Sequence, residues 1–334
     1  MPRVAVLLPA RDAAGTVRAA AVSILRQSHR DLALVAVDDG SRDGTAAILE
    51  GLARRDRRVQ VIHGPGEGIA LALNRGLASC DAEVVVRMDA DDVAHPRRVE
   101  RQLAALEADP ALAAVGSRVR LFPRRGVAGG MARYAAWLNG LVTPDLVARD
   151  LLVEAPLVHP ASAIRREALE EAGGWRDGDF PEDYDLWLRL SAAGRRLSNV
   201  PEVLLDWRES PSRLTRTDGR YALSRHVALK AAWLAAGGLA GRSEVAIWGA
   251  GETGRAFARA LSRHGVGVAL FLEVDARKIG RTVAGAPVLS YEEAARARGL
   301  PLLVAVGAPG ARELIRAELG RQGFEETRDY RCVA

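Results

Sequence analysis

Three carboxylates, Asp89, Asp91 and Asp92, stand directly after a strand predicted over residues 83–88. Burying several carboxylates at the end of a strand costs free energy unless positive charge lies among them. The divalent cations Mg²⁺ and Mn²⁺ bind oxygen ligands and keep coordination positions for phosphate oxygens. A cation held here could bridge the two phosphates of a nucleoside diphosphate and act as a Lewis acid on that leaving group.

A second acidic pair, Asp38 and Asp39, ends another apolar run. On its own, the 89–92 pattern fits equally well a solvated acidic turn or a cap of the helix predicted from Arg97. Carboxylates that follow strands of one parallel sheet meet at the same edge of that sheet. The second pair therefore favours a shared functional cluster over a solvated turn.

A third acidic group, Glu182, Asp183 and Asp185, follows Pro181 and opens a segment with helical spacing. Carboxylates at a helix N-terminus are stabilised by the helix dipole, so capping alone also explains them. A carboxylate held near a reacting hydroxyl can also take its proton as a general base. This group therefore supplies a candidate general base.

The elements that must position these carboxylates alternate between strand and helix over the first hundred residues. Strands are predicted at 3–9, 32–37, 58–62 and 83–88, with helices at 16–27, 45–55 and 69–79 between them. This alternation predicts a mostly parallel sheet with helices on both faces. Because ligands of such sheets bind beyond the carboxyl ends of the strands, we expect the turns 10–12, 38–41 and 89–92 to share one crevice.

The next hundred residues have a weaker pattern. A helix from Arg97 leads to two weak strands, 111–115 and 118–122, and residues 131–215 mix helix and strand. An apolar-faced helix over 221–236 then ends at a glycine pair, which is typical of a linker.

A second unit begins at Arg242, and its glycines carry a recognisable spacing. Strands are predicted at 244–248, 268–274 and 302–307, and helices at 291–298 and 311–322. Gly249, Gly251 and Gly254 follow the first strand and open a helix, and Asp275 comes at the end of the second strand. This context is that of a dinucleotide-binding turn, in which phosphate meets backbone N–H groups.

The second unit is nevertheless only about ninety residues long, half of a full dinucleotide-binding fold. It has no Tyr-x-x-x-Lys pair that could drive hydride transfer. Ligand binding and a purely structural role both stay open, and we do not expect NAD(P) as a cofactor.

Composition excludes several classes of protein. The chain has 334 residues, 49% hydrophobic and 27% charged, which is typical of one large globular domain or two smaller ones. All basic residues except Lys230 and Lys278 are arginines, which pair well with diphosphates although most such side chains are solvated. Two cysteines make no disulfide framework, and neither a signal peptide nor an 18-residue apolar run occurs. We expect a cytoplasmic protein without a nucleic-acid partner.

Taken in order, eight short motifs give this sequence a specific resemblance. They are Val6–Asp12, Val37–Asp43, Leu73–Gly76, Met88–Asp92, His95–Arg98, His159–Ser162, Gly173–Trp175 and Glu182–Arg189. Each motif is weak alone, but together and in this order the chain resembles the family 2 glycosyltransferases with the GT-A fold over residues 1–215. The second unit resembles small Rossmann-like domains attached to sugar-modifying enzymes, through 274–278 and 285–288.

The resemblance implies a role for each matching position. Asp39 would hydrogen-bond a uracil-like base, Asp89 and Asp91 would contact ribose and metal with Asp91 the direct ligand, and Asp183 would be the general base. The residues expected to contact the nucleotide are Pro9, Ala10, Arg11, Asp12, Asp38, Asp39, Asn74, Arg75, Asp89 and Ala90. Arg11 and Asp12 depart from the family, whose members often carry an aromatic residue and an asparagine there.

Three further residues are candidates for contact with the acceptor or the diphosphate: Glu182, Trp175 and Arg208. A packed core tryptophan is at least as common as one that stacks on a sugar. In the second unit, Gly249, Gly251, Gly254 and Asp275 are the candidates for a nucleotide.

We therefore expect an α/β protein: a GT-A domain at 1–215, a helical linker at 216–241 and a Rossmann-like domain at 242–334. The expected activity is an inverting, metal-dependent transfer of a sugar from a nucleoside-diphosphate sugar, with a UDP-sugar favoured, to a hydroxyl of a glycan or lipid-linked acceptor. Association with the inner membrane face and with further copies of the chain stays open. The alternatives are an NAD(P)-dependent sugar oxidoreductase acting through the second unit and a non-catalytic nucleotide-sugar-binding protein. A nucleotidyltransferase would need a Gly-rich phosphate loop, which the turn after the first strand does not provide.

Overall fold

The computed structural model describes residues 3–123, 127–211 and 213–334. These residues form two compact units, each with its own sheet. The first unit comprises Met1–Ala148, Pro156–Gly178 and Glu182–Thr217, and the second comprises Arg149–Ala155, Asp179–Pro181 and Asp218–Ala334. The helix predicted as a linker thus belongs to the second unit, together with two short segments from earlier in the chain.

The first unit is built on an eight-stranded sheet with the order β3-β2-β1-β4-β7-β6-β8-β5. Its strands are β1 (Val4–Ala10), β2 (Leu32–Asp39), β3 (Val59–Gly64), β4 (Val84–Arg87), β5 (Val93–Ala94), β6 (Leu112–Phe122), β7 (Ala163–Arg165) and β8 (Arg196–Arg208). The strands β1 to β4 run parallel, and so do β6 and β8, whereas β7 is antiparallel to both of its neighbours and β5 to β8. The sheet is mostly parallel, as predicted.

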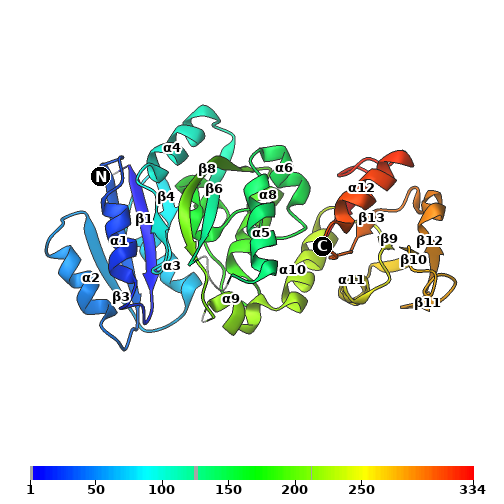
Figure 1. The fold of residues 1–334 in the computed structure, drawn as a ribbon, viewed down its shortest axis with the longest axis horizontal. Coiled ribbons are helices and arrows are strands. Elements are labelled where there is room, and N and C mark those ends of the chain that lie inside the picture. Colours follow the sequence, from blue (N-terminus) through cyan, green and yellow to red (C-terminus); the bar gives the residue numbers. More distant parts are fainter. Residues whose placement is uncertain (1–2, 124–126, 212) are drawn as a thin grey trace. The chain divides into compact units, whose positions relative to one another are not determined.

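Helices cover both faces of this sheet (Figure 1). They are α1 (Val17–Leu25), α2 (Thr45–Ala53), α3 (Ile69–Ala78), α4 (Arg98–Ala108), α5 (Gly129–Gly140), α6 (Pro144–Asp150), α7 (Arg166–Glu171), α8 (Glu182–Ala192) and α9 (Leu214–Thr217), with a 3-10 turn at His159–Ala161. Side chains alternate between faces along a strand. Val6 and Leu8 accordingly join the core cluster beneath α1, whereas Leu7 lies near Gly76 of α3.

Two predicted strands are a single strand in the structure. The run Leu112–Phe122 forms β6 without interruption, and its pairing with β8 shifts register at three points. Such irregularities let a long strand twist and bend while it stays paired. The weak pattern around residues 116–118 therefore indicates an irregular stretch of one strand and not a turn between two.

The second unit has a six-stranded sheet with the order β11-β12-β10-β9-β13-β14. Its strands are β9 (Glu244–Trp248), β10 (Gly267–Glu273), β11 (Thr282–Val283), β12 (Ala286–Ser290), β13 (Leu302–Val304) and β14 (Tyr330–Cys332). The helices are α10 (Leu223–Ala236), α11 (Glu252–Ser262) and α12 (Ala311–Arg321), with 3-10 turns at Gly219–Tyr221 and Tyr291–Ala297. The last of these turns is where an α-helix was predicted.

In the second sheet β9 pairs in parallel with β10 and with β13. Together, β9, α11 and β10 make a βαβ unit in which the glycine-rich turn joins the first strand to the helix. Over the parts of the chain that the structure describes, no helix combines the length and the apolar character that crossing a bilayer requires.

Candidate functional site

The acidic residues that follow β4 form one group. A carboxylate oxygen from each of Asp89, Asp91 and Asp92 lies within 4.8 Å of the others. The backbone N–H of Arg208 donates to Oδ1 of Asp92 at 2.7 Å, whereas Oδ2 of Asp92 is buried and has no hydrogen-bond partner among the described residues. Because an unpaired buried carboxylate oxygen costs free energy, this group has the chemistry to bind a cation.

The electrostatics of the acidic group support the same conclusion. Burial, and after it the charge of Asp89, raises the pKa of Asp91 to about 6. Burial and the charges of Asp89 and Asp91 also raise the pKa of Asp92 well above its ordinary value. Arg208 and Arg213 act in the opposite direction without cancelling these effects. The group therefore holds more negative charge than its surroundings neutralise.

A buried arginine, Arg87, lies beside the acidic group and was missed by the sequence analysis. It is the last residue of β4, it is 1% exposed, and its guanidinium pairs with the carboxylate of Asp89. Burial lowers the pKa of Arg87, but the charges of Asp89 and Glu182 outweigh this effect, so the pKa is raised. An arginine inside the run Val84–Met88 was the available signal, because a buried guanidinium needs a carboxylate close by.

A second buried arginine, Arg98 at the start of α4, fixes the end of β4. Its Nη2 donates to the carbonyl of Arg87 at 2.7 Å and to that of Ser162 at 3.3 Å, and its Nε donates to Gln102 at 3.1 Å. Burial lowers the pKa of Arg98 to about 9. These bonds hold the backbone from which the acidic group projects.

Arg208, a predicted diphosphate candidate, reaches the acidic group from β8. Its Nε donates to the backbone carbonyl of Asp91 at 2.7 Å. Its guanidinium stacks 4.4 Å from the ring centre of Phe122, as that of Arg213 does 4.2 Å from Trp207. Two arginines with packed guanidinium planes therefore stand near the carboxylates.

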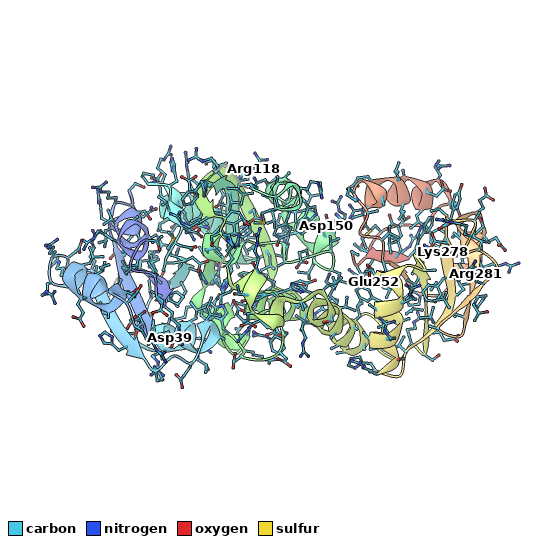
Figure 2. The ribbon with its side chains drawn as sticks, turned by 60° about the horizontal axis from the view of Figure 1, so that its bottom comes forward. Asp39, Arg118, Asp150, Glu252, Lys278 and Arg281 are labelled. Atoms are coloured by element: carbon cyan, nitrogen blue, oxygen red, sulfur yellow. The ribbon has the colours of Figure 1, made fainter. Side chains whose placement is uncertain are left out.

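The turn after β2 places its two acids in different surroundings. The carboxylate of Asp39 accepts hydrogen bonds from the backbone N–H groups of Gly66 (3.1 Å), Glu67 (3.0 Å) and Gly68 (2.8 Å). Asp38 is buried, and its Oδ1 has no hydrogen-bond partner in the described chain. Asp39, in the N-terminal part of the molecule (Figure 2), thus shapes the loop between β3 and α3, and a base contact at this residue stays a prediction.

The turn after β1 is tied to the turn after β2. Pro9 and Ala10 end β1 in register with Val37 and Asp38. Asp12 has φ of +49°, donates its backbone N–H to Ser41 Oγ at 3.0 Å and accepts from the backbone N–H of Arg42 at 2.7 Å. Arg11 donates to the carbonyl of Gly66 at 3.3 Å. Hydrogen bonds thus connect the β1 turn to the β2 turn and to the β3–α3 loop.

The register of the sheet brings the β4 turn to the same edge. Leu7 of β1 pairs with Arg87 of β4, and the backbone N–H of Met88 donates to the carbonyl of Leu7. The β4 turn, including Ala90, therefore starts at the edge of the sheet where β1 and β2 also end.

Asn74 and Trp175 bond to each other across 101 residues of sequence. The amide of Asn74 donates to the carbonyl of Trp175 at 2.6 Å and accepts from its N–H at 3.0 Å. Trp175 is 2% exposed, and its indole N–H donates to Nε2 of His159 at 2.9 Å. This ring has no exposed face for a sugar in the structure. Arg75 pairs with Glu67 at 2.5 Å, on the loop that Asp39 holds.

The acids Glu182 and Asp183 open α8, as predicted. Glu182 is buried 3.7 Å from Nδ1 of His159, and the charge of Glu182 acts on Arg87. Asp183 is half-buried and its Oδ1 accepts from the backbone N–H of Tyr184 at 2.7 Å. Glu182 at the start of α8 and Asp89 of the acidic group both raise the pKa of Arg87, so both lie near this arginine.

In the second unit the residue that meets the glycine-rich turn is Glu273. Its carboxylate accepts from the backbone N–H of Ala250 at 3.1 Å and from Nζ of Lys278 at 3.0 Å. Asp275, a predicted nucleotide contact, lies two residues beyond the end of β10 and pairs with Arg277 at 3.0 Å. The prediction that Asp275 ends this strand is therefore wrong, because β10 ends at Glu273.

The glycines of the turn have steric reasons to be glycine. Gly249 has φ of +109°, which favours glycine, and a Cβ at Gly254 would lie 1.8 Å from the carbonyl oxygen of Gly249. This close approach of helix and strand explains two of the three glycines without a ligand. Glu252 and Lys278 lie in the same unit (Figure 2).

The first unit is an α/β domain with acids at the ends of its parallel strands, and comparison with known proteins shows its class. Residues 5–173 match the model of the glycosyl transferase family 2, which is half of the chain. The chain therefore belongs to this family, and the protein is a glycosyltransferase.

Two curated relatives and one solved structure illustrate the likeness. The amylovoran biosynthesis glycosyltransferase AmsE of Erwinia amylovora is 31% identical over 46% of this chain and 54% of its own length. The O-antigen biosynthesis glycosyltransferase WbnJ of Escherichia coli is 29% identical over 56% of this chain and 71% of its own. The mannosyltransferase PcManGT of Pyrobaculum calidifontis, solved with GDP-Man and Mn²⁺, superposes with a TM-score of 0.53 over 69% of this chain and 63% of its own, at 24% identity.

Proposed function

We propose that this glycosyltransferase is inverting and metal-dependent, and that it moves a sugar from a nucleoside-diphosphate sugar to a hydroxyl acceptor. The observation that carries the proposal is the group Asp89, Asp91 and Asp92, in which one buried oxygen of Asp92 has no hydrogen-bond partner among the described residues. Three carboxylates this close together repel one another unless a cation joins them.

The donor set fits Mg²⁺ or Mn²⁺, both hard cations that take carboxylate oxygens. Asp91 would be the direct ligand, with Asp89 and Asp92 close by. When bound, the cation would supply Lewis-acid stabilisation of the charge that develops on the diphosphate leaving group. PcManGT was solved with Mn²⁺ and a nucleotide sugar, which supports a metal-assisted donor site in this chain as well.

The nucleotide would lie along the linked turns after β1, β2 and β4. Pro9 to Asp12 would line it, and the loop that Asp39 holds would close one side of the pocket, since three backbone N–H groups fix that loop to a single carboxylate. Arg208 is the arginine we assign to the diphosphate, because its guanidinium is already stacked and bonded beside Asp91. A UDP-sugar is the favoured donor.

Asp183 would be the general base for the acceptor hydroxyl. It is half-buried at the N-terminus of α8, where the helix dipole favours a carboxylate, and its Oδ1 accepts from the backbone N–H of Tyr184 at 2.7 Å. Glu182 is less suited to this task, because it is 2% exposed and lies against His159. We assign the proton transfer to Asp183 and a positioning role to Glu182.

The acceptor we propose is a growing surface polysaccharide or another glycan. AmsE and WbnJ are named for amylovoran and O-antigen biosynthesis, and both are similar in sequence to part of this chain. The acceptor then presents a sugar hydroxyl to Asp183.

The test of the metal site is the substitution Asp91→Ala in the full chain. Calorimetric titration with UDP-sugars, GDP-sugars and dTDP-sugars, with Mn²⁺ or with EDTA, should show donor binding that needs Mn²⁺ in the wild type and is lost in the variant. Asp81→Ala, which changes an exposed acid outside the group, is the matched control and should bind as the wild type does. Unchanged donor affinity in Asp91→Ala would contradict the proposal.

A further inference from the structure

A cavity of about 340 Å³ lies in the second unit, away from its glycine-rich turn. It is lined by the first residues of β13 and β14, Leu302 and Tyr330, which pair with each other, and by Arg242 just before β9. The glycine-rich turn follows the carboxyl end of β9. The cavity is therefore at the amino end of these parallel strands, on the opposite edge of the sheet.

The lining of this cavity carries a marked excess of positive charge. Arg242, Arg298, Arg328 and Arg331 all line it, and Asp329 is the one acid among the lining residues of the described chain. Asp329 is already paired with Arg328 at 2.9 Å. Among the lining residues, four arginines thus stand against one acid, which is already paired.

Of these arginines, Arg298 is held in place by its contacts, and Arg331 is partly buried without a partner in the described chain. Nη2 of Arg298 donates to the carbonyl of Gln322 at 2.6 Å, and its guanidinium lies 4.6 Å from the ring centre of Phe324. Arg331 is half-buried, and within the described residues its side chain has neither a hydrogen bond nor an ion pair. Burial lowers the pKa of Arg331, although the charge of Glu326 opposes this effect. A partly desolvated guanidinium without a partner costs free energy that an anion would recover.

The size and the charge of the cavity define the class of ligand. Its volume is at the lower end of the range for small-molecule sites, about 300–1,000 Å³. Planar guanidinium groups bind phosphate oxygens two at a time, and several of them together suit a group that carries two or more negative charges. We propose that this cavity binds a small molecule through a diphosphate group, at a site separate from the sugar-transfer site of the first unit.

The probe that tests the cavity is inorganic pyrophosphate, titrated calorimetrically into the full chain in the presence of EDTA. EDTA removes any divalent cation and with it metal-dependent binding at Asp91. The wild type should bind pyrophosphate, and Arg331→Gln and Arg298→Gln should each bind it about tenfold more weakly or worse, the scale of one charge-assisted hydrogen bond. Arg331→Lys keeps the charge and should recover part of the affinity.

The matched control is Arg321→Gln, which removes an exposed arginine of α12 that pairs with Glu318 and does not line the cavity. It should bind pyrophosphate as the wild type does, and thermal melts should show that all variants are folded. The absence of wild-type binding at millimolar pyrophosphate overturns the proposal. Equal binding by the wild type and both glutamine variants overturns it as well.

Two sources of a diphosphate are open to this site, a free nucleotide and a lipid-linked diphosphate. UDP and the water-soluble geranyl diphosphate, titrated under the same conditions, distinguish them. Tighter binding of UDP than of pyrophosphate assigns the site to a nucleotide, and tighter binding of geranyl diphosphate assigns it to a prenyl-linked sugar carrier. Either preference must be lost in Arg331→Gln, since binding that survives this change lies elsewhere. Failure of metal-dependent donor binding at Asp91 would leave this result untouched.

Discussion

The two units place carboxylates at the same topological position, the carboxyl end of a parallel strand, and treat them in opposite ways. In the first unit, Asp92 keeps a buried oxygen without a partner in the described chain, and burial and neighbouring charge raise the pKa of Asp91 to about 6. In the second unit, burial raises the pKa of Glu273, but Lys278 and three backbone N–H groups overcome this effect, and the pKa is lowered.

Whether its own unit satisfies a strand-end carboxylate separates a structural acid from a functional candidate. The carboxylate of Glu273 is fully hydrogen-bonded within its own unit. It accepts from the backbone N–H groups of Ala250, Val274 and Asp275, and Lys278 adds a positive charge. Among the described residues, Asp91 and Asp92 have no comparable set of donors, so a bound cation gains more free energy there. A carboxylate whose oxygens all have donors stabilises the fold. A group of carboxylates that lacks donors can bind a cation.

The largest expected effect comes from Asp183→Asn, which tests whether chemistry is confined to the first unit. Loss of the general base should lower kcat by roughly 100-fold or more while donor affinity stays unchanged. Steady-state kinetics and calorimetry measure the two quantities separately. Asp145→Asn, at an exposed acid of α6, is the control and should leave both unchanged. Near-normal turnover in Asp183→Asn would remove this residue from the mechanism.

A smaller effect, on stability and not on turnover, is expected from Glu273→Gln. The change removes the charge that Lys278 and the backbone N–H groups bind, and should lower the free energy of unfolding by about 1–3 kcal/mol. Urea unfolding gives the magnitude, and hydrogen exchange should locate the loss in residues 242–334. Asp275→Asn, which loses an exposed pair with Arg277, should lower the free energy of unfolding less than Glu273→Gln does, because solvent screens an exposed pair. The contrast between a structural acid in the second unit and a functional group in the first fails if Glu273→Gln abolishes metal-dependent donor binding while the protein stays as stable as the wild type.

The smallest effect is the pH dependence of that stability difference. The pKa of Glu273 is lower in the folded protein than the value of about 4.3 that an unfolded glutamate has. Its contribution is therefore complete above that unfolded value and is lost as the pH falls through the folded pKa. The difference in unfolding free energy between the wild type and Glu273→Gln should shrink when measured at pH 3 instead of pH 7. A difference that grows on acidification would show that the sign of the shift is wrong.

Much of the fold could be predicted because its signals are local. The four parallel strands of the first unit lie within two residues of their predicted ends, and β9 matches its predicted range. Apolar alternation and turn residues act over a few neighbours, so they are readable from sequence. The continuity of β6 was mispredicted, because pairing with the distant strand β8 decides it, and Tyr291–Ala297 is a 3-10 helix where an α-helix was predicted.

Local patterns in the sequence showed which acids follow a strand and which open a helix, and so they indicated Asp39, Asp91 and Asp183 as a set. Only the tertiary structure decided which polar groups are already satisfied: Asn74 by Trp175, Asp39 by the β3–α3 loop, and Glu273 by its own turn. It also decided that Arg87 is buried against Asp89. The physical reason is that strand ends follow from local pattern, whereas desolvation and hydrogen-bond partners depend on residues that are distant in sequence and close in space.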